Sequence, residues 1–180
     1  SYTSAHKKNV LSDGLAVQAL TLLAANMDRV LAEPGDLQAR SNMLLGSMLA
    51  GMAFANAPVA AVHALAYPLG GHFHVPHGLS NALVLVPVLN FNRPAAEALY
   101  AQLASAVLPG QRFASPREAC DGFIDFMTRL VARMPFAQRL SEVGVTESDI
   151  NQLTDDALKI ERLLINNPRP LDRDDIHALY

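Results

Sequence analysis

The chain has 180 residues, of which 51% are hydrophobic, and 14 Lys and Arg against 17 Asp and Glu give a formal net charge of -3. This length is sufficient for one domain with a substantial core, and the apolar content predicts that burial drives folding. The basic residues are scattered, so nucleic acid is not expected as a partner. Polar residues interrupt the apolar runs before the roughly 18 residues of a membrane span, which predicts a soluble chain without a membrane partner.

The single cysteine, Cys120, cannot form a disulfide within the chain, and this is consistent with the reducing cytoplasm. No charged leader followed by an apolar core is present, so the sequence indicates no cleaved signal peptide. Ser1 is not a start methionine, and the helical pattern that opens at Leu171-Asp172 is still running at Tyr180. We therefore expect the chain to be a piece of a longer protein.

Apolar residues recur at helical spacing over most of the chain, and no alternating strand pattern is present. A first helix is predicted from Ser12, with Ser12 or Asp13 as its N-cap, to a stop at Pro34-Gly35. A second, over residues 36–56, has small residues between its Leu and Met side chains, which predicts that it is largely buried. Further helices are expected over residues 59–69, 76–89 with Pro76 in the first turn, 93–108, 116–134, 146–164 with a break near Leu153-Thr154, and from 172 onward. The predicted fold is an all-α bundle forming a single domain over residues 1–180.

Four of the six histidines, His63, His72, His74 and His77, lie within fifteen positions. His63 and Tyr67 are four residues apart and so share one helix face. In an unbroken helix His63 and His77 would be about 21 Å apart. Pro68 and the following Gly-Gly pair are expected to break the helix, so that His77 comes within reach of a metal ion bound by His63.

Another interpretation is that these histidines bind no metal and only contribute to helix packing or lie in turns. Two ligands are too few for a catalytic metal ion, and no acidic residue lies between Asn56 and Asn92 to complete a set. His72 and His74 flank Phe73, a spacing that suits a loop with both rings at the mouth of a cleft.

Several stretches closely resemble the C-terminal domain of the iron-containing (group III) alcohol dehydrogenases. The most specific are Gly51 to Asn56, His63 to Gly71, and Val75 to Ala82. The likeness extends back to Leu11-Ser12-Asp13-Gly14 and forward to Asn167-Pro168-Arg169, so it covers almost the whole chain.

The resemblance implies a two-domain enzyme in which an N-terminal α/β domain binds NAD(P) and the helical domain holds Fe²⁺ or Zn²⁺. In that family one aspartate and three histidines bind the metal, which implies that His63 and His77 are the last two ligands. The other two, in an Asp-x-x-x-His pattern, would fall just before Ser1. The glycine-rich phosphate loop of the cofactor site would likewise lie upstream.

The resemblance also implies roles for other residues, each with a structural alternative. Phe54 matches a position that lines the cleft near the nicotinamide, although a core role is equally open. Tyr67 stands where many members have a second histidine near the substrate, and would be the catalytic proton-bearing group; otherwise it is a ring beside Pro68. Leu163 and Leu164 match a region that approaches the substrate, or they form the last turn of a packed helix.

The leading hypothesis is the metal-bearing domain of an NAD(P)-dependent dehydrogenase, inactive as this piece alone and a homo-oligomer at full length. It would transfer hydride between the cofactor and a primary alcohol or hydroxy acid, or the corresponding aldehyde. Glycerol dehydrogenases and dehydroquinate synthases rank second, because the glutamate often seen after their His-Gly element is missing after His77-Gly78. A non-enzymatic helical binding module is the alternative from another class.

Overall fold

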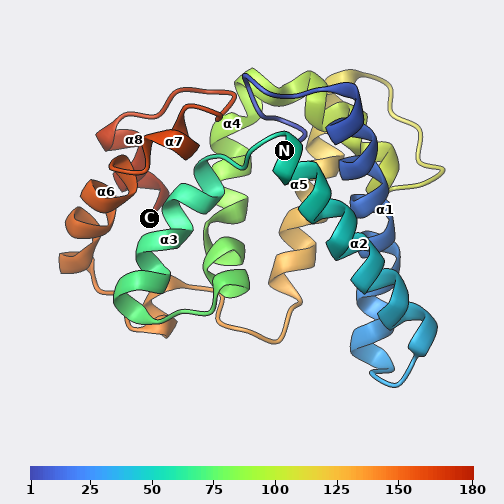
Figure 1. Ribbon diagram of the computed structural model, residues 1–180, viewed down its shortest axis with the longest axis horizontal. Helices are drawn as coiled ribbons and strands as arrows, with labels where there is room; N and C mark the ends of the chain where they lie inside the picture. The colour runs from blue at the N-terminus through green and yellow to red at the C-terminus, as the bar shows by residue number, and fades with distance from the viewer. The chain divides into compact units, whose positions relative to one another are not determined.

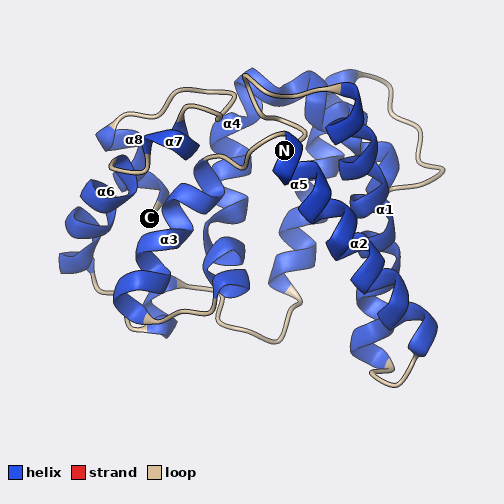
Figure 2. Ribbon diagram, viewed as in Figure 1, coloured by secondary structure: helices blue, strands red, loops and turns tan.

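The computed structural model describes residues 1–180, and all of its regular elements are helices (Figure 2). The predicted all-α fold is thus confirmed. In chain order the elements are α1 (Val10–Ala32), α2 (Leu37–Asn56), α3 (Ala61–Phe73), α4 (His77–Val107), α5 (Pro116–Ala132), the short 3₁₀ helices η1 (Leu140–Val143) and η2 (Glu147–Asp149), α6 (Ile150–Leu158), α7 (Glu161–Leu164) and α8 (Arg173–Leu179).

The chain forms two compact units, a division that the sequence analysis did not resolve. The first, called here the α1–α2 unit, comprises Ser1–Pro58 and Glu97–Phe123. The second comprises Val59–Ala96 and Ile124–Tyr180. It contains His63, Tyr67 and His77 and is called the histidine unit. Helices α4 and α5 contribute residues to both units.

Helix α1 begins earlier than predicted, because Asn9 and not Ser12 or Asp13 is its N-cap. The Asn9 Oδ1 atom accepts hydrogen bonds from the backbone N–H groups of Leu11 and Ser12, at 3.1 and 3.0 Å. The Ser12 hydroxyl oxygen in turn accepts from the Asn9 N–H at 3.1 Å. This reciprocal capping box satisfies donors that the first helical turn leaves without partners, so the helix starts at Val10.

Helices α1 (blue) and α2 (teal) lie side by side as an antiparallel pair (Figure 1). Gly46 permits the close approach, since a Cβ at this position would lie 2.9 Å from Leu23 Cγ and 3.3 Å from the Ala19 carbonyl oxygen. Further along the pair, Asn42 Nδ2 donates to Oδ1 of the buried Asn26 at 3.1 Å. The small residues of α2 therefore serve as the contact face toward α1.

The prediction that α2 is largely buried is wrong for its large side chains. Only Ala39, Gly46 and Ala53 of α2 are buried. Because these small residues face α1, the bulky apolar side chains project from the rest of the helix surface. The exposed ones are Leu37, Leu44, Leu45, Met48, Met52 and Phe54.

The expectation that no segment could span a membrane needs a correction at α1. This helix is long and apolar enough to do so by length and composition alone. A mostly buried core helix of a soluble protein and a signal sequence near the N-terminus pass the same test, whereas α1 packs against α2 but has only 17% of its apolar window buried.

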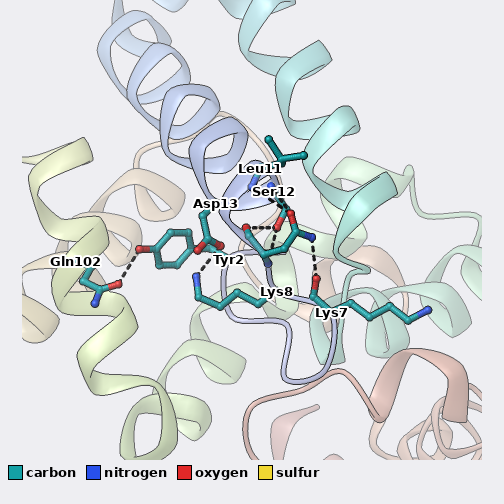
Figure 3. A network of polar contacts seen from close by, with 8 residues as sticks. Tyr2, Lys7, Lys8, Leu11, Ser12, Asp13 and Gln102 are labelled. Carbon is teal, nitrogen blue, oxygen red and sulfur yellow. Dashed lines mark hydrogen bonds and ion pairs between the residues drawn. The ribbon is translucent and has the colours of Figure 1, made fainter.

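The first residues of the chain are tied to helices of the α1–α2 unit (Figure 3). The Tyr2 hydroxyl donates to Gln102 Oε1 in α4 at 2.7 Å. The Lys8 ammonium lies 3.5 Å from the centroid of the Tyr2 ring and 2.6 Å from Asp13 Oδ1 in α1. A cation–π contact and an ion pair thus meet at one lysine and fix the segment that precedes α1.

The histidine unit is built around α3, which contacts α6 and α7, while α6 contacts α8. Its core contains fully buried apolar side chains from four helices: Leu65, Leu69, Val84, Val88, Leu153 and Ile176. Burying a side chain of this size contributes about 1.5–3 kcal/mol relative to leaving it in water, so this core holds α3 firmly in place.

The loop after α7 is fastened to α4 by polar contacts. The side-chain amides of Asn92 and Asn167 are buried and exchange two hydrogen bonds, at 2.6 and 3.0 Å. Arg169 donates to the Phe91 carbonyl oxygen at 3.0 Å, and its guanidinium lies 3.8 Å from the centroid of the Phe91 ring. The Asn-Pro-Arg motif therefore has a structural role in joining this loop to α4.

Several helix boundaries differ from prediction. The two helices predicted over residues 76–89 and 93–108 are one helix, α4, which continues through Pro87 and Pro94 and ends at Val107. The segment 146–164 is interrupted at Lys159 and Ile160, between α6 and α7, and not near Leu153-Thr154. Both of these last residues are fully buried within α6, so packing favours a continuous helix there.

The predicted break at Pro68 and Gly70-Gly71 is also wrong. Helix α3 continues through the buried Pro68 to Phe73. A proline inside a helix removes one backbone hydrogen bond and costs about 3 kcal/mol, which burial of the neighbouring apolar side chains can offset. Sequence rules that consider only the local backbone therefore place the break too early.

The chain folds back at residues 74–76 instead. His74 is the C-cap of α3 and has a left-handed backbone, with φ 55° and ψ 26°. The next residue, Val75, is buried, and its N–H donates to the Leu69 carbonyl oxygen at 3.5 Å. Pro76 then precedes the first residue of α4, and its carbonyl oxygen accepts the first hydrogen bond of this helix, from the Ser80 N–H at 2.9 Å. This turn brings the start of α4 beside α3.

Because only glycine adopts a left-handed backbone without a steric penalty, His74→Gly is expected to stabilise the protein by up to about 1 kcal/mol. Urea unfolding of the full-length protein measures this change. His74→Ala is the matched control, since it removes the imidazole but keeps the Cβ, and it should give no such gain. A His74→Gly variant no more stable than His74→Ala would contradict the assigned turn.

Candidate metal centre

Three rings of the histidine unit converge next to this turn. His63 and Tyr67 lie one helical turn apart on α3, and His77 is the first residue of α4. The ring centroids of His63 and His77 are 5.3 Å apart, with their planes inclined by 56°. The Tyr67 ring lies 6.4 Å from His63, edge to face, and 6.1 Å from His77. The structure thus brings together the three side chains on which the sequence hypothesis depends.

The orientation of α3 explains why these rings are available to a ligand. Ala64, Leu65 and Leu69 occupy the core face of the helix and are fully buried. His63 and Tyr67 lie on a different face, where Tyr67 keeps 40% of its surface exposed. Core packing therefore sets the direction in which the two polar rings project.

His63 is electrostatically suited to bind a cation through nitrogen. Its pKa is lowered from the ordinary 6.5 to about 4, mainly by burial and then by the charge that His77 can carry. At neutral pH the imidazole is therefore uncharged and presents a lone pair. A neutral ring is the form that metal ions require.

Helix α4 supplies one further polar group, the side chain of Asn81, one turn beyond His77. Its Nδ2 atom lies 3.1 Å from His77 Nε2 and 3.4 Å from His77 Nδ1. The same atom donates to the His77 carbonyl oxygen at 2.8 Å. The Oδ1 atom of Asn81 is buried and has no hydrogen-bond partner.

The donor set fits part of a transition-metal site. Imidazole nitrogens bind zinc at about 2 Å, so rings with centroids 5.3 Å apart can reach one ion. The 180 residues contain no group of three or more His, Cys, Asp or Glu side chains placed to hold a metal. His63 and His77 alone would therefore be too few ligands for a catalytic metal ion.

The other two clustered histidines lie elsewhere in the histidine unit. His72 Nε2 is 2.7 Å from Asp156 Oδ2 in α6, and Asp156 also pairs with Lys159 at 2.6 Å. His72 belongs to helix α3 and not to a loop, although it does line a small cavity together with Phe73. His74 forms the left-handed turn. These two residues have structural contacts that do not involve the His63 and His77 rings.

The remaining predicted site residues differ in how far they are buried. Leu163 is 3% exposed and belongs to the core of the histidine unit, so its placement favours the packed-helix alternative. Leu164 is only half-buried, at the edge of the same core. Phe54 lies in the last turn of α2 with 51% of its surface exposed, which does not support a core role.

Asn81 is the residue that sequence reasoning did not assign. It lies inside the stretch from Val75 to Ala82 that carried the family resemblance, but it was given no role. Its spacing could have indicated this contact, because a residue four positions after His77 lies on the same face of a helix.

These features define an all-helical domain in which two imidazoles lie close enough to reach one ion. The whole chain, residues 1–180, matches the profile described as "Fe-containing alcohol dehydrogenase family, C-terminal". The protein therefore belongs to the iron-containing alcohol dehydrogenase family.

Curated relatives agree with this assignment. The chain is 43% identical over 169 residues to long-chain-alcohol dehydrogenase 1 of Geobacillus thermodenitrificans, covering 94% of the chain and 43% of that protein. It is 36% identical to 1,3-propanediol dehydrogenase of Klebsiella pneumoniae, covering 96% of the chain and 44% of that protein. It is 31% identical to 4-hydroxybutyrate dehydrogenase of Clostridium kluyveri, covering 96% of the chain and 46% of that protein. The chain thus spans less than half the length of these relatives.

Solved structures show the same fold. A 1,3-propanediol oxidoreductase superposes with a TM-score of 0.92 at 36% identity, covering 99% of the chain and 46% of that structure. An alcohol dehydrogenase from Oenococcus oeni gives 0.91 at 31% identity, with the same coverage of both chains. A sulfoacetaldehyde reductase from Bifidobacterium kashiwanohense, solved in complex with NAD⁺, gives 0.83 at 25% identity, covering 99% of the chain and 44% of that structure.

The lowered pKa of His63 can be tested by NMR titration of the metal-free protein. The ring should titrate with a pKa of about 4. Since the unfolded state binds this proton at the ordinary pKa of 6.5, the stability contributed by the neutral ring is present above pH 6.5 and is lost as the pH falls toward 4.

His77→Gln provides the control for the cause of this shift. It should raise the pKa of His63, because the charge of His77 is removed, but leave it below 6.5, because burial remains. A wild-type value at or above 6.5 would show that the ring is not desolvated as described.

Proposed function

We propose that this chain is the metal-bearing domain of an NAD(P)-dependent dehydrogenase acting on primary alcohols or hydroxy acids. The observation that carries the proposal is the approach of His63 and His77 to a centroid distance of 5.3 Å, with His63 neutral at physiological pH. Two imidazoles side by side on a helical domain can both donate a ring nitrogen to one cation, and the relatives described for this chain are alcohol and hydroxy-acid dehydrogenases.

His63 and His77 would supply two ligands of the metal ion, and the remaining aspartate and histidine would come from residues outside the 180. We assign the ion as Fe²⁺, in keeping with the family description, while the imidazole donors would also accept Zn²⁺. The cofactor would be held by an N-terminal α/β domain. The more than twofold greater length of the relatives supports such a domain.

The reaction removes a hydride from the alcohol carbon and a proton from its oxygen, giving an aldehyde and the reduced nicotinamide. When bound, the metal ion would act as a Lewis acid toward the substrate oxygen. Tyr67 would relay the proton, because its ring lies beside both histidines and is exposed enough for its hydroxyl to meet a substrate. In the oxidation its oxygen would accept the alcohol proton while its own proton passes to solvent, and in the reverse direction the hydroxyl would donate its proton and regain one from solvent.

Two further contacts are proposed for the full-length enzyme. Phe54, with half of its surface exposed, would contact the nicotinamide cofactor. Leu164 would contribute to an apolar substrate pocket more directly than Leu163, which is needed for the core.

We also propose that the full-length protein is a cytoplasmic homo-oligomer. The exposed leucine and methionine side chains of α2 support a further protein surface covering this helix, since contiguous apolar side chains are uncommon on monomers. A glycerol dehydrogenase-like activity remains the second candidate, and turnover of glycerol against simple primary alcohols distinguishes the two.

The test measures bound metal and NAD(P)-linked turnover in the full-length protein. His63→Ala and His77→Ala should each lose most of the bound metal and at least about 100-fold in turnover, because each removes one ligand. Tyr67→Phe should keep the metal and lower turnover by about 100-fold, the usual effect of losing a positioned proton donor.

His72→Ala is the matched control, since its ring is paired with Asp156 and not with the other imidazoles. It should retain both metal and turnover. If His63→Ala and His77→Ala behaved like His72→Ala, the ligand assignment would be wrong. A wild-type protein that bound no metal and turned over no alcohol would favour the binding-module alternative.

A further inference from the structure

We propose that one exposed face of α2 is covered, in the full-length protein, by a helix of the same polypeptide that precedes Ser1. This outer face is the side of α2 turned away from α1. Its members are all exposed: Leu37, Ser41, Leu44, Met48, Met52 and Ala55. The inference concerns the α1–α2 unit alone, so it does not depend on the proposed metal ligands of the histidine unit.

Helical geometry places the outer face opposite α1. The buried residues of α2, on the side of α1, are Ala39, Gly46 and Ala53. Leu37 and Leu44 precede two of these residues by two positions each, which corresponds to a rotation of about 200° round an α-helix. Their exposed fractions are 80% and 73%. Helix α2 therefore has a second apolar side that α1 cannot reach.

The outer face of α2 has no charged side chain. The sequence contains no Asp, Glu, Lys or Arg between Arg40 and Arg93, so the whole of α2 beyond Arg40 is uncharged. A helix with one side in water ordinarily has polar and charged residues on that side, whereas a helix that is apolar all round is buried. The composition of α2 thus indicates a second packing partner.

Helix α1 shows the usual solvent-facing pattern within the same unit. Thr21 and Asp28 follow the buried Ala19 and Asn26 by two positions each, so they lie on the side of α1 turned away from α2. Both residues are exposed and polar. The two helices of one antiparallel pair therefore differ at corresponding positions, with polar residues on the outer side of α1 and Leu and Met on that of α2.

An uncharged apolar face suits a permanent partner. Interfaces that stay assembled are more hydrophobic than transient ones and resemble a domain core cut in half, and charged residues are depleted at their centre. A protein surface that covers α2 permanently can belong to a second copy or to the same polypeptide.

The comparisons with known proteins favour the same polypeptide. The chain aligns over 99% of its length with only 46% of the 1,3-propanediol oxidoreductase structure, and the profile that it matches describes the C-terminal part of the family. More than half of such a protein is thus available to supply a helix that precedes Ser1. A segment joined covalently to this unit reaches α2 at a high effective concentration, whereas a second copy must associate from solution.

The spacing of the outer face fits a helix as the covering element. Its members recur every three or four positions, the spacing with which one helix packs along another. A Cβ added at the neighbouring Gly51 would have no atom within 4 Å, so the surface is open there. Small residues at Ser41, Gly51 and Ala55 leave recesses beside Leu44 and Met48 for the side chains of a second helix.

The first experiment measures the reaction of introduced cysteines with a maleimide in the full-length protein. Ser41→Cys and Met48→Cys probe the outer face, and Ala25→Cys, at an exposed position of α1, is the control. The native Cys120 is fully buried, and peptide mass spectrometry separates its labelling from that of the new thiols. Both outer-face thiols should react at least about 100-fold more slowly than Ala25→Cys, because a covered site reacts only after local opening.

The second experiment identifies the covering segment without changing the sequence. Full-length protein grown with photo-methionine, a photoreactive analogue of methionine, is illuminated, and its crosslinks are located by peptide mass spectrometry. Met48 should crosslink to a residue that precedes Ser1, in chains that run at monomer mass on a denaturing gel. Met48→Leu is the matched control, since it keeps the apolar volume but should lose this crosslink.

Three outcomes would overturn the inference. Outer-face thiols as reactive as Ala25→Cys would show that the face is uncovered. Crosslinks from Met48 found only at dimer mass would assign the face to a second copy. Protection of Ser41→Cys that appears only with vesicles of phosphatidylcholine and phosphatidylglycerol would assign it to a membrane. None of these results changes the metal content or the turnover by which the proposed function is tested.

Discussion

The left-handed turn at His74 is the constraint on which the candidate site depends. Helix α3 holds His63 and Tyr67, and only three residues separate its end from His77, the first residue of α4. Such a short connection between two helices requires one residue to leave the right-handed backbone, and His74 does so with φ 55°. Without this reversal the two imidazoles would be about 21 Å apart along one helix.

Burial determines both the direction in which His63 projects and the protonation state of its ring. The core face of α3 fixes the helix against α6 and α7, so His63 projects from a rigid element and not from a loop. Partial burial of its ring disfavours the imidazolium and lowers the pKa of the group. The apolar core thus both orients the donor and keeps it in the neutral form.

Much of this was predictable from sequence, and the exceptions have physical causes. Helical periodicity gave the all-α fold, and the motif around His63 and His77 gave the family, which the comparison with known proteins confirms. The position of the helix break was missed because Pro68 is buried in a packed helix, where tertiary contacts outweigh the lost hydrogen bond. The exposed face of α2 could not be foreseen, since an apolar stripe does not reveal whether its partner lies within the same chain segment.

The central claim is that His63 and His77 bind one metal ion. Anomalous diffraction from crystals of the metal-loaded, full-length protein, recorded at the iron and zinc absorption edges, tests it most directly. We predict a single anomalous peak about 2 Å from a ring nitrogen of each of these two histidines. An ion bound at full occupancy away from either ring would contradict the assignment.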